Sequence, residues 1–325
     1  MSVIPVVFRT FQHGGLDHPY RELHELQPAL SAMRLGASLY VPATRPDLAA
    51  IANGRKLPQL RSLILCTEDA VHERDLEQAL AHLAALLPEL ERGPLLRFIR
   101  PRNPTVLRRL LRLDSIERIQ GFVLPKFGLH PGGLAAGLGR QQGPSSVADL
   151  ETVEAFDRRK MEFLRDQLED SGLRDRVLCL RIGGNDLLNL LGIRRARGAT
   201  IYDTPLRNTI ADLVCIFHPA GYRLSAPVFE RLDTPEVLAR EVEADLQHGL
   251  RGKTAIHPAQ IPVIEALYRV SRDDYEMASA VLAADAAAVF RLYDTFCEPA
   301  THRRWAAGVL ERARVFGVTA ISDEN

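Results

Sequence analysis

The strongest constraint on the fold is a repeated alternation between short apolar runs rich in β-forming residues and longer segments with helical periodicity. Parallel strands joined by helices produce this pattern, because each strand is covered by helices and reads as a nearly continuous apolar run. Eight such runs occur between residues 37 and 257. The predicted strands are Ala37–Ala43, Arg61–Asp69, Leu95–Asn103, Gly121–Phe127, Ser146–Thr152, Val177–Gly183, Tyr222–Phe229 and Thr254–His257.

Eight β/α units in about 250 residues predict a closed (β/α)8 TIM barrel. The alternative is an open doubly wound sheet, which usually carries a GxGxxG turn after its first strand. The chain lacks such an early turn. We therefore predict an N-terminal arm over residues 1–36, with a helix over Tyr20–Met33, and a barrel over residues 37–270. An Ala-rich helical appendage over residues 271–325 is predicted to form a lid over the barrel mouth or an oligomer contact.

The composition argues against several classes of partner. The 41 Lys and Arg residues balance the 41 Asp and Glu residues, so no overall basic field attracts nucleic acid or an anionic membrane. No run approaches the length of a membrane span, and the first residues do not resemble a signal peptide. The four cysteines form no CxxC pair, and three of them lie in apolar runs. This favours buried, reduced thiols and a cytoplasmic location.

The stretch Val177–Gly192 shows most clearly how a strand end of this chain is built. Its apolar run stops at Gly183 and Gly184, one carboxylate follows at Asp186, and a helical pattern begins at Leu187. Glycine lets the backbone come close to a ligand, and the C-terminal ends of barrel strands are where active sites gather. Asp186 is therefore a candidate site residue, although capping of the next helix is an equally good interpretation.

Across the predicted strand ends, carboxylates and arginines are common, whereas sulfur and imidazole ligands are few. This donor set is typical of a site for a hard cation such as Mg2+, which takes oxygen ligands and needs only one or two protein carboxylates. Glu151 and Asp186, on adjacent predicted strands, are suited to this role. An arginine on a neighbouring strand would hold a substrate carboxylate in a bidentate arrangement.

Other polar residues at the strand ends have two interpretations. Glu68 and Asp69 either act in the site or cap the following helix. Lys126 is either a Schiff-base lysine or, as we favour, a structural or substrate-steering cation. His257 is a candidate general base, but its place before a proline favours a structural role. Ser225 has no GxSxG context and is not expected to be a nucleophile.

Six segments, taken in order, resemble the citrate lyase beta subunit and the wider HpcH/HpaI aldolase group, which includes malyl-CoA lyases. The resemblance covers roughly residues 37 to 270, and its most specific part is residues 249–264. The segments are SLYVPATRPDLAAI, LILCTEDAV, GFVLPKF, LET, GGNDLLNLLG and GLRGKTAIHPAQIPVI.

The resemblance implies a Mg2+-dependent barrel lyase. Its chemistry would be an aldol or Claisen-type cleavage or condensation of a 2-oxo or 2-hydroxy acid, or of the corresponding acyl-CoA thioester. The family's metal ligands fall on Glu151 and Asp186, and its Glu-Asp pair after the second strand falls on Glu68 and Asp69. The substrate-binding arginine falls on Arg100 or Arg102, and counting from the apolar run favours Arg100.

The resemblance also concerns partners. It implies a homo-oligomer, a trimer or hexamer, and allows a carrier or partner subunit. Two alternatives to a free lyase follow: a non-catalytic or carrier-associated subunit, and a thioester hydrolase on the same metal site. The chain departs from the family at Cys66 and Thr67, which stand where the family has Asp and Leu, and in the Gly-rich segment before Glu151. These departures leave open whether CoA is bound.

Overall fold

The computed structural model describes residues 31–129, 145–172 and 174–319. The predicted N-terminal helix therefore lies almost entirely outside the described residues, as does most of the Gly-rich segment before Glu151. All described residues belong to one structural unit that begins at Ser31.

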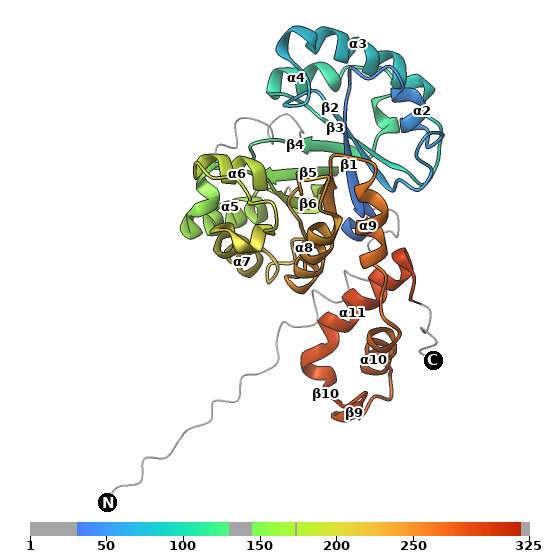
Figure 1. Cartoon of the computed structure of the whole chain (residues 1–325), viewed down its shortest axis with the longest axis vertical. Helices are drawn as coiled ribbons and strands as arrows, with labels where there is room; N and C mark the ends of the chain where they lie inside the picture. The colour runs from blue at the N-terminus through green and yellow to red at the C-terminus, as the bar shows by residue number, and fades with distance from the viewer. Residues whose placement is uncertain (1–30, 130–144, 173, 320–325) are drawn as a thin grey trace, which may run out of the picture. The chain divides into compact units, whose positions relative to one another are not determined.

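Eight parallel strands form the centre of this unit (Figure 1). Strands β1 to β7 pair in chain order, and β8 pairs with β1. A parallel bridge between Ala226, next to β7, and Lys253 of β8 completes the ring. The predicted TIM barrel is confirmed, with every strand within a few residues of its expected range. The strands are β1 (Ala37–Pro42), β2 (Ser62–Cys66), β3 (Leu96–Arg100), β4 (Gly121–Leu124), β5 (Ser145–Leu150), β6 (Val177–Ile182), β7 (Leu224–Ser225) and β8 (Lys253–Ala255).

Helices follow the strands and pack on the outside of the ring. Local sequence sets their limits. For example, the Asp157 side chain accepts hydrogen bonds from the first backbone N–H groups of α5, and Asn103 caps α4 ahead of a proline. The buried residues Met161, Leu164 and Leu168 then give α5 one apolar stripe. The helices around the barrel are α2 (Leu48–Ala52), α3 (Leu76–Leu86), α4 (Pro104–Leu110), α5 (Arg158–Asp170), α6 (Gly184–Leu190), α7 (Leu206–Phe217), α8 (Pro235–Gln247) and α9 (Gln260–Leu267).

Two apolar clusters form the core, one outside the ring of strands and one inside it. The larger one fills the space between strands and helices, and the smaller one, with Ile64, Phe98 and Cys179, fills the barrel interior. A short 3-10 helix, η1 (Ala32–Leu35), contributes to this interior cluster. Since Ser62 at the start of β2 donates a hydrogen bond of 2.5 Å to the Leu35 carbonyl, η1 closes the N-terminal end of the barrel.

The C-terminal region differs from the continuous helical pattern that the sequence predicts. Helices α10 (Arg272–Leu282) and α11 (Pro299–Phe316) are present, but between them β9 (Phe290–Leu292) and β10 (Thr295–Cys297) form an antiparallel hairpin. The prediction was wrong here because it followed the alanine run and overlooked the turn. Tyr293 and Asp294 both adopt positive φ angles, 48° and 57°, which a two-residue hairpin turn requires.

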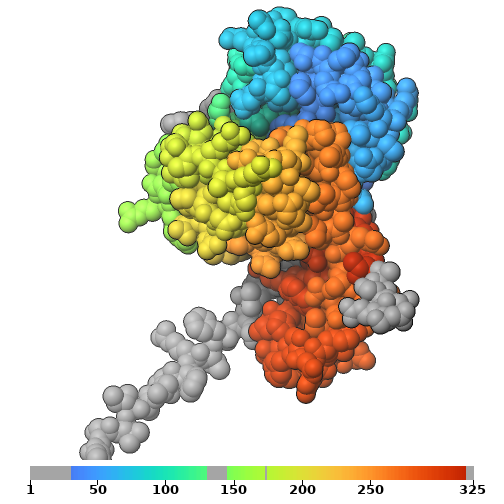
Figure 2. Space-filling model, viewed as in Figure 1, coloured from blue at the N-terminus to red at the C-terminus, as the bar shows by residue number. Residues whose placement is uncertain are grey.

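The C-terminal helices pack on each other and meet the barrel unit through a few specific contacts. Tyr268, just after α9, stacks on Phe316 of α11 with ring centroids 4.9 Å apart. Val270 and Val318 form a parallel bridge. Figure 2 shows this region in red on the surface, beside the orange residues around α9. Within the described ranges, no helix has the length and apolar character needed to cross a bilayer.

A buried ion network joins β8 to α8 in the outer layer of the barrel. Lys253 is 1% exposed, and its Nζ lies 2.9 Å from Glu241 Oε1 and 2.7 Å from Asp245 Oδ2. Asp245 also accepts a hydrogen bond from the Tyr202 hydroxyl at 2.7 Å. The lysine of the most family-like segment is therefore structural: it ties a strand to the helix that covers it.

We predict that Lys253→Met lowers the free energy of unfolding by about 3–5 kcal/mol, because it leaves the buried Asp245 carboxylate without its cation and leaves Glu241 with Arg195 alone, 3.3 Å away. Chemical denaturation followed by circular dichroism measures this change. Arg109→Ala is the control, since it breaks an exposed pair with Glu77 and should have little effect. Equal effects of the two substitutions would contradict a structural role for the buried network.

Candidate active site

The C-terminal ends of β2 to β6 bring charged side chains together inside the barrel mouth. The alternation of side chains along a strand explains which ones point inward. In β3, Leu96 and Phe98 belong to the interior cluster, and Arg100 continues the same face. In β5, Val147 belongs to that cluster, and Asp149 and the residue after the strand, Glu151, continue the same face. The site thus begins where the apolar filling of the barrel ends.

Arg100 lies at the centre of this group and is only 8% exposed. Its Nη2 is 2.9 Å from Glu68 Oε2 and 3.0 Å from Glu151 Oε1. Its Nη1 is 3.3 Å from Asp149 Oδ2, and Asp69 Oδ2 lies 3.8 Å from Nη2. One guanidinium therefore contacts carboxylates from β5 and from the end of β2.

Arg102, the other arginine of the same segment, contacts backbone carbonyls instead of carboxylates. Its Nη2 donates to the Glu68 carbonyl at 3.0 Å and also to the Val71 carbonyl, and its Nε donates to the Thr67 carbonyl at 3.3 Å. These bonds hold the turn that carries Glu68. Of the two arginines that the sequence offers, the structure places Arg100 among the carboxylates and Arg102 on backbone oxygens.

Glu151 is held from two sides. Its Oε1 accepts hydrogen bonds from Arg100 and, at 2.8 Å, from the backbone N–H of Lys126, a residue with a left-handed φ of 52°. The Lys126 side chain lies 3.4 Å from Glu68 Oε1. Lys126 is therefore an ion-pair partner at the mouth, and its role as a structural or substrate-steering cation stays a prediction.

The two glycines after β6 are in close contact with neighbouring strands, and Gly183 is the one that lies against Glu151. A Cβ on Gly183 would lie 2.3 Å from Glu151 Cβ, which no side chain tolerates, and a Cβ on Gly184 would lie 2.6 Å from Pro227 Cβ. The sequence suggests that these glycines let backbone approach a ligand. In the structure, Gly183 instead makes room for the Glu151 side chain from the neighbouring strand.

Asp186 lies in the first turn of α6, and its side chain is half-buried. Asp186 is not the N-cap residue, because Gly183 occupies that position and Asp186 is the third residue of the helix. Its carboxylate accepts a hydrogen bond from its own backbone N–H and lies close enough to Asp69, Arg100 and Lys126 to feel their charges.

The other two polar candidates are accounted for by local contacts. His257 is exposed, and its Nδ1 accepts a hydrogen bond of 3.2 Å from the Ala259 N–H. Ser225 is buried, and its hydroxyl lies 3.4 Å from Arg181 Nε. Neither residue contacts the carboxylate group around Arg100 through these bonds, and their predicted structural roles stay predictions.

Burial raises the pKa of the carboxylates in the site, and the negative charges of their neighbours add to the effect for Glu151 and Asp186. Burial, together with the negative charge of Asp149, raises the pKa of Glu151 to about 8. Burial also raises the pKa of Glu68, Asp149 and Asp186, and the charge of Asp69 adds to the shift of Asp186. The carboxylates outnumber the cations near them by two. The five carboxylates are those of Glu68, Asp69, Asp149, Glu151 and Asp186, and the three cations are Arg100, Lys126 and Arg181.

This imbalance fits a divalent cation. Neither carboxylate oxygen of the fully buried Asp149 accepts a hydrogen bond, although Oδ2 lies 3.3 Å from Arg100 Nη1. Within the described part of the chain, no three His, Cys, Asp or Glu side chains converge as a complete metal cage. Mg2+ does not need one, because it binds one or two carboxylates and completes its shell with water and substrate oxygens. Glu151 and Asp186 fit that requirement.

Sequence reasoning missed three inner residues of the site. Asp149 contacts Arg100, while Arg181 donates a hydrogen bond to the Tyr40 hydroxyl and lies over the Tyr40 ring, 5.2 Å from its centroid. The signal was present: Asp149 precedes Glu151 by two positions, and Arg181 precedes Gly183 by two. A charged residue on the inward face of an otherwise apolar strand marks the floor of a site.

Comparison with known proteins places this geometry in context. Residues 29–318 match a family described as C-C bond lyases of the TIM-barrel fold. A search of curated proteins found no match.

Several solved structures share the fold at low sequence identity. CitE from Mycobacterium tuberculosis, crystallised with magnesium, acetoacetate and coenzyme A, is 24% identical, with a TM-score of 0.63 over 86% of this chain and 99% of that one. A citrate lyase from Burkholderia xenovorans is 21% identical, with a TM-score of 0.67 over 89% of this chain and 94% of that one. RipC from Yersinia pestis is 23% identical, with a TM-score of 0.53 over 72% and 95% of the two chains.

We predict that Gly183→Ala displaces Glu151, because the new methyl group would overlap the Glu151 side chain. The barrel should still fold, but any binding that uses Glu151 should weaken at least about tenfold, as expected for a group moved by 1 Å or more. Calorimetric titration with Mg2+ measures the effect. Gly198→Ala, at a position where a Cβ meets no atom within 4 Å, is the control.

The raised pKa of Glu151 also predicts how stability depends on pH. Between pH 4.5 and about 8 the folded state holds a proton that the unfolded state has lost, so the metal-free protein loses stability as pH rises through this range. The slope for one such group is at most about 1.4 kcal/mol per pH unit. Glu151→Gln should flatten this dependence in thermal melts taken from pH 5 to 8, whereas the outer-surface change Glu162→Gln should not. A dependence that is the same in wild type and Glu151→Gln would show that Glu151 is not the titrating group.

Proposed function

Because the chain belongs to the C-C bond lyase family of the TIM-barrel fold, we propose that it cleaves or forms a carbon–carbon bond in a 2-oxo or 2-hydroxy acid, or in its CoA thioester, with Mg2+ bound at the barrel mouth. The observation that carries this proposal is the group of carboxylates around Arg100, whose excess negative charge suits a divalent cation next to an arginine that can receive a substrate anion.

The proposed metal ligands are Glu151 and Asp186. The half-buried position of Asp186, the glycine gap that accommodates Glu151 and the oxygen-only donor set support this assignment. Proteins that share the fold have been crystallised with magnesium together with acetoacetate or pyruvate. When bound, Mg2+ would act as a Lewis acid toward the carbonyl and carboxylate oxygens of the substrate.

Arg100 is proposed to bind and neutralise the oxygen on which negative charge develops. Its guanidinium is fixed by Asp149 on one side and by Glu68 and Glu151 on the other, so it needs little reorganisation during the reaction. Arg102 is proposed to act indirectly, by holding the turn with Glu68 and Asp69 in place.

Proton transfer is assigned to the end of β2. Glu68 is buried and paired with both Arg100 and Lys126, and this suits it to positioning those two cations. The Asp69 side chain is 64% exposed and lies at the edge of the same cluster. We therefore propose Asp69 as the group that exchanges a proton with substrate or water.

We further propose that the protein works as a homo-oligomer, a trimer or hexamer, in a reducing compartment. Exposed apolar residues at two separate places support association: Leu190, Leu191 and Ile193 at and after the end of α6, and Phe296 and Trp305 in the C-terminal region. The region after residue 271 would then be a subunit contact or a lid. All four cysteines are free, which supports a reducing compartment.

We predict that Glu151→Gln and Asp186→Asn each reduce Mg2+-dependent turnover at least about a hundredfold while the fold is kept. The assay uses a panel of 2-oxo acids, 2-hydroxy acids and their CoA thioesters, with products identified by NMR. Glu162→Gln is the matched control, since it removes a carboxylate from the outer face of α5.

Product analysis separates the alternatives. Shortened carbon skeletons support the lyase, and free acid with an intact skeleton would indicate thioester hydrolysis instead. Turnover that appears only after a carrier or partner chain is added would support a subunit of a larger complex. Wild-type turnover by either variant at low Mg2+ would overturn the ligand assignment.

A further inference from the structure

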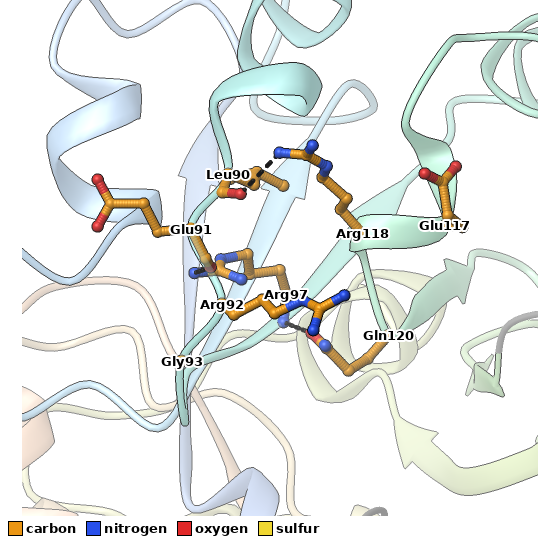
Figure 3. A pocket seen from close by; sticks show the side chains of 8 residues that line it. All are labelled: Leu90, Glu91, Arg92, Gly93, Arg97, Glu117, Arg118 and Gln120. Carbon is orange, nitrogen blue, oxygen red and sulfur yellow. Dashed lines mark hydrogen bonds between the residues drawn. The ribbon is translucent and has the colours of Figure 1, made fainter.

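A pocket of about 650 Å³ lies at the N-terminal ends of β3 and β4, the opposite end of these strands from the candidate active site (Figure 3). It is formed by the turn before β3, residues 90–93, by Arg97 of β3 itself, and by Glu117, Arg118 and Gln120 before β4. The volume is in the usual range for small-molecule sites. Neither the lyase reaction nor the core explains why this surface is hollow and rich in arginine.

Arg97 is the first sign that the pocket takes an anion. Its side chain is only 4% exposed, and its donors are aimed by backbone carbonyls: Nε bonds to the Ala52 carbonyl at 2.6 Å and Nη2 to the Glu91 carbonyl at 2.8 Å. Among the described residues, no carboxylate lies within 4.0 Å of its nitrogens. A buried cation normally has a counter-ion, and here the open side of the guanidinium region is the pocket.

Arg118 is oriented in the same way. Its Nη1 donates to the Pro88 carbonyl at 2.6 Å and to the Leu90 carbonyl at 3.0 Å. Gln120 is fixed through its Oε1, which accepts a hydrogen bond of 2.6 Å from the Arg97 backbone N–H. The Arg97 and Arg118 side chains are therefore held in place by neutral carbonyl groups. This arrangement keeps their positive charge and their remaining N–H donors for a ligand.

The carboxylates at the pocket cancel only part of this charge, although the charge of Glu91 raises the pKa of Arg97 against the opposing effect of burial. Glu91 forms an ion pair with Arg55, outside the pocket, and Figure 3 shows its side chain directed away from Arg92 and Arg97. Glu117 is then the one remaining acidic side chain in a lining that holds Arg92, Arg97 and Arg118. The lining has an excess of positive charge in a chain whose overall formal charge is zero.

We propose that this pocket binds a small molecule through a phosphate group, at a site separate from the barrel mouth. Fixed guanidinium groups match the tetrahedral oxygens of phosphate well. The volume is large enough for a phosphate-bearing metabolite of nucleotide size rather than for a single ion alone. Arg97 is three positions from Arg100 on β3, so the two sites are about 10 Å apart along one strand.

The experiment titrates the full-length protein, free of metal, with inorganic phosphate, pyrophosphate and ADP by calorimetry at low ionic strength. Arg92→Ala/Arg118→Ala should weaken binding of the preferred probe at least tenfold. Arg108→Ala/Arg112→Ala is the matched control, since it removes the same charge from exposed positions on and just after α4 and should bind like wild type. If Arg118 proves necessary for folding, Arg92→Glu alone replaces the double variant, because the Arg92 side chain is exposed.

The probes distinguish the source of the phosphate. Tighter binding of ADP than of the inorganic ions indicates a nucleotide-like ligand, and equal binding indicates the phosphate group alone; both support the proposal. Hydrogen exchange should show protection at the starts of β3 and β4. The proposal is overturned if no probe binds at millimolar concentration, if the control double variant loses as much affinity, or if protection appears only at the barrel mouth.

Discussion

The site depends on the contact between one buried guanidinium and the carboxylates around it. Arg100 lies within 3.3 Å of Glu68, Asp149 and Glu151, so it is the cation that allows these acids to be buried together. One arginine does not balance them, and the pKa of Glu151 stays raised, at about 8. The protein thus carries a site that is electrostatically incomplete by itself. That incompleteness is what a divalent cation and an anionic substrate relieve.

The barrel creates this arrangement by continuing a simple pattern. The side chains that fill the lower part of the barrel, from η1 to the level of Phe98 and Cys179, are apolar. The inward side chains become charged only near the C-terminal ends of the strands. The outer layer then keeps the strands in place, in part through the buried pairs of Lys253 with Glu241 and Asp245. Two local contacts complete the site. Gly183, after β6, leaves room for the Glu151 side chain, and Arg102 donates hydrogen bonds to the carbonyls of the turn after β2.

The fold could be predicted from the sequence because eight buried strands, each followed by a helical segment, produce a repeated pattern that few architectures share. The sequence also indicated Arg100, Glu151 and Asp186, whose positions after apolar runs place them at the mouth. Asp149 and Arg181 were missed although their spacing of two from Glu151 and Gly183 was visible in the sequence, because the face of each strand that points inward is known only from the barrel. The hairpin at Tyr293 and Asp294 was also missed, because the turn depends on two left-handed residues within an otherwise helix-prone segment. The pocket at Arg97 could not be predicted from the sequence, because two segments that are separate in the chain, residues 90–97 and 117–120, come together to form it.

The most direct test of the account is a calorimetric titration of Mg2+ into the metal-free protein at pH 7, in two buffers with different ionisation enthalpies, with and without pyruvate or oxaloacetate. A carboxylate with a pKa of about 8 must lose its proton to bind a cation. We therefore expect Mg2+ to bind, to release protons into the buffer, and to bind more tightly with the oxo acid. Absence of binding, or binding without proton release, would contradict the view that the buried carboxylates at the barrel mouth form a metal site.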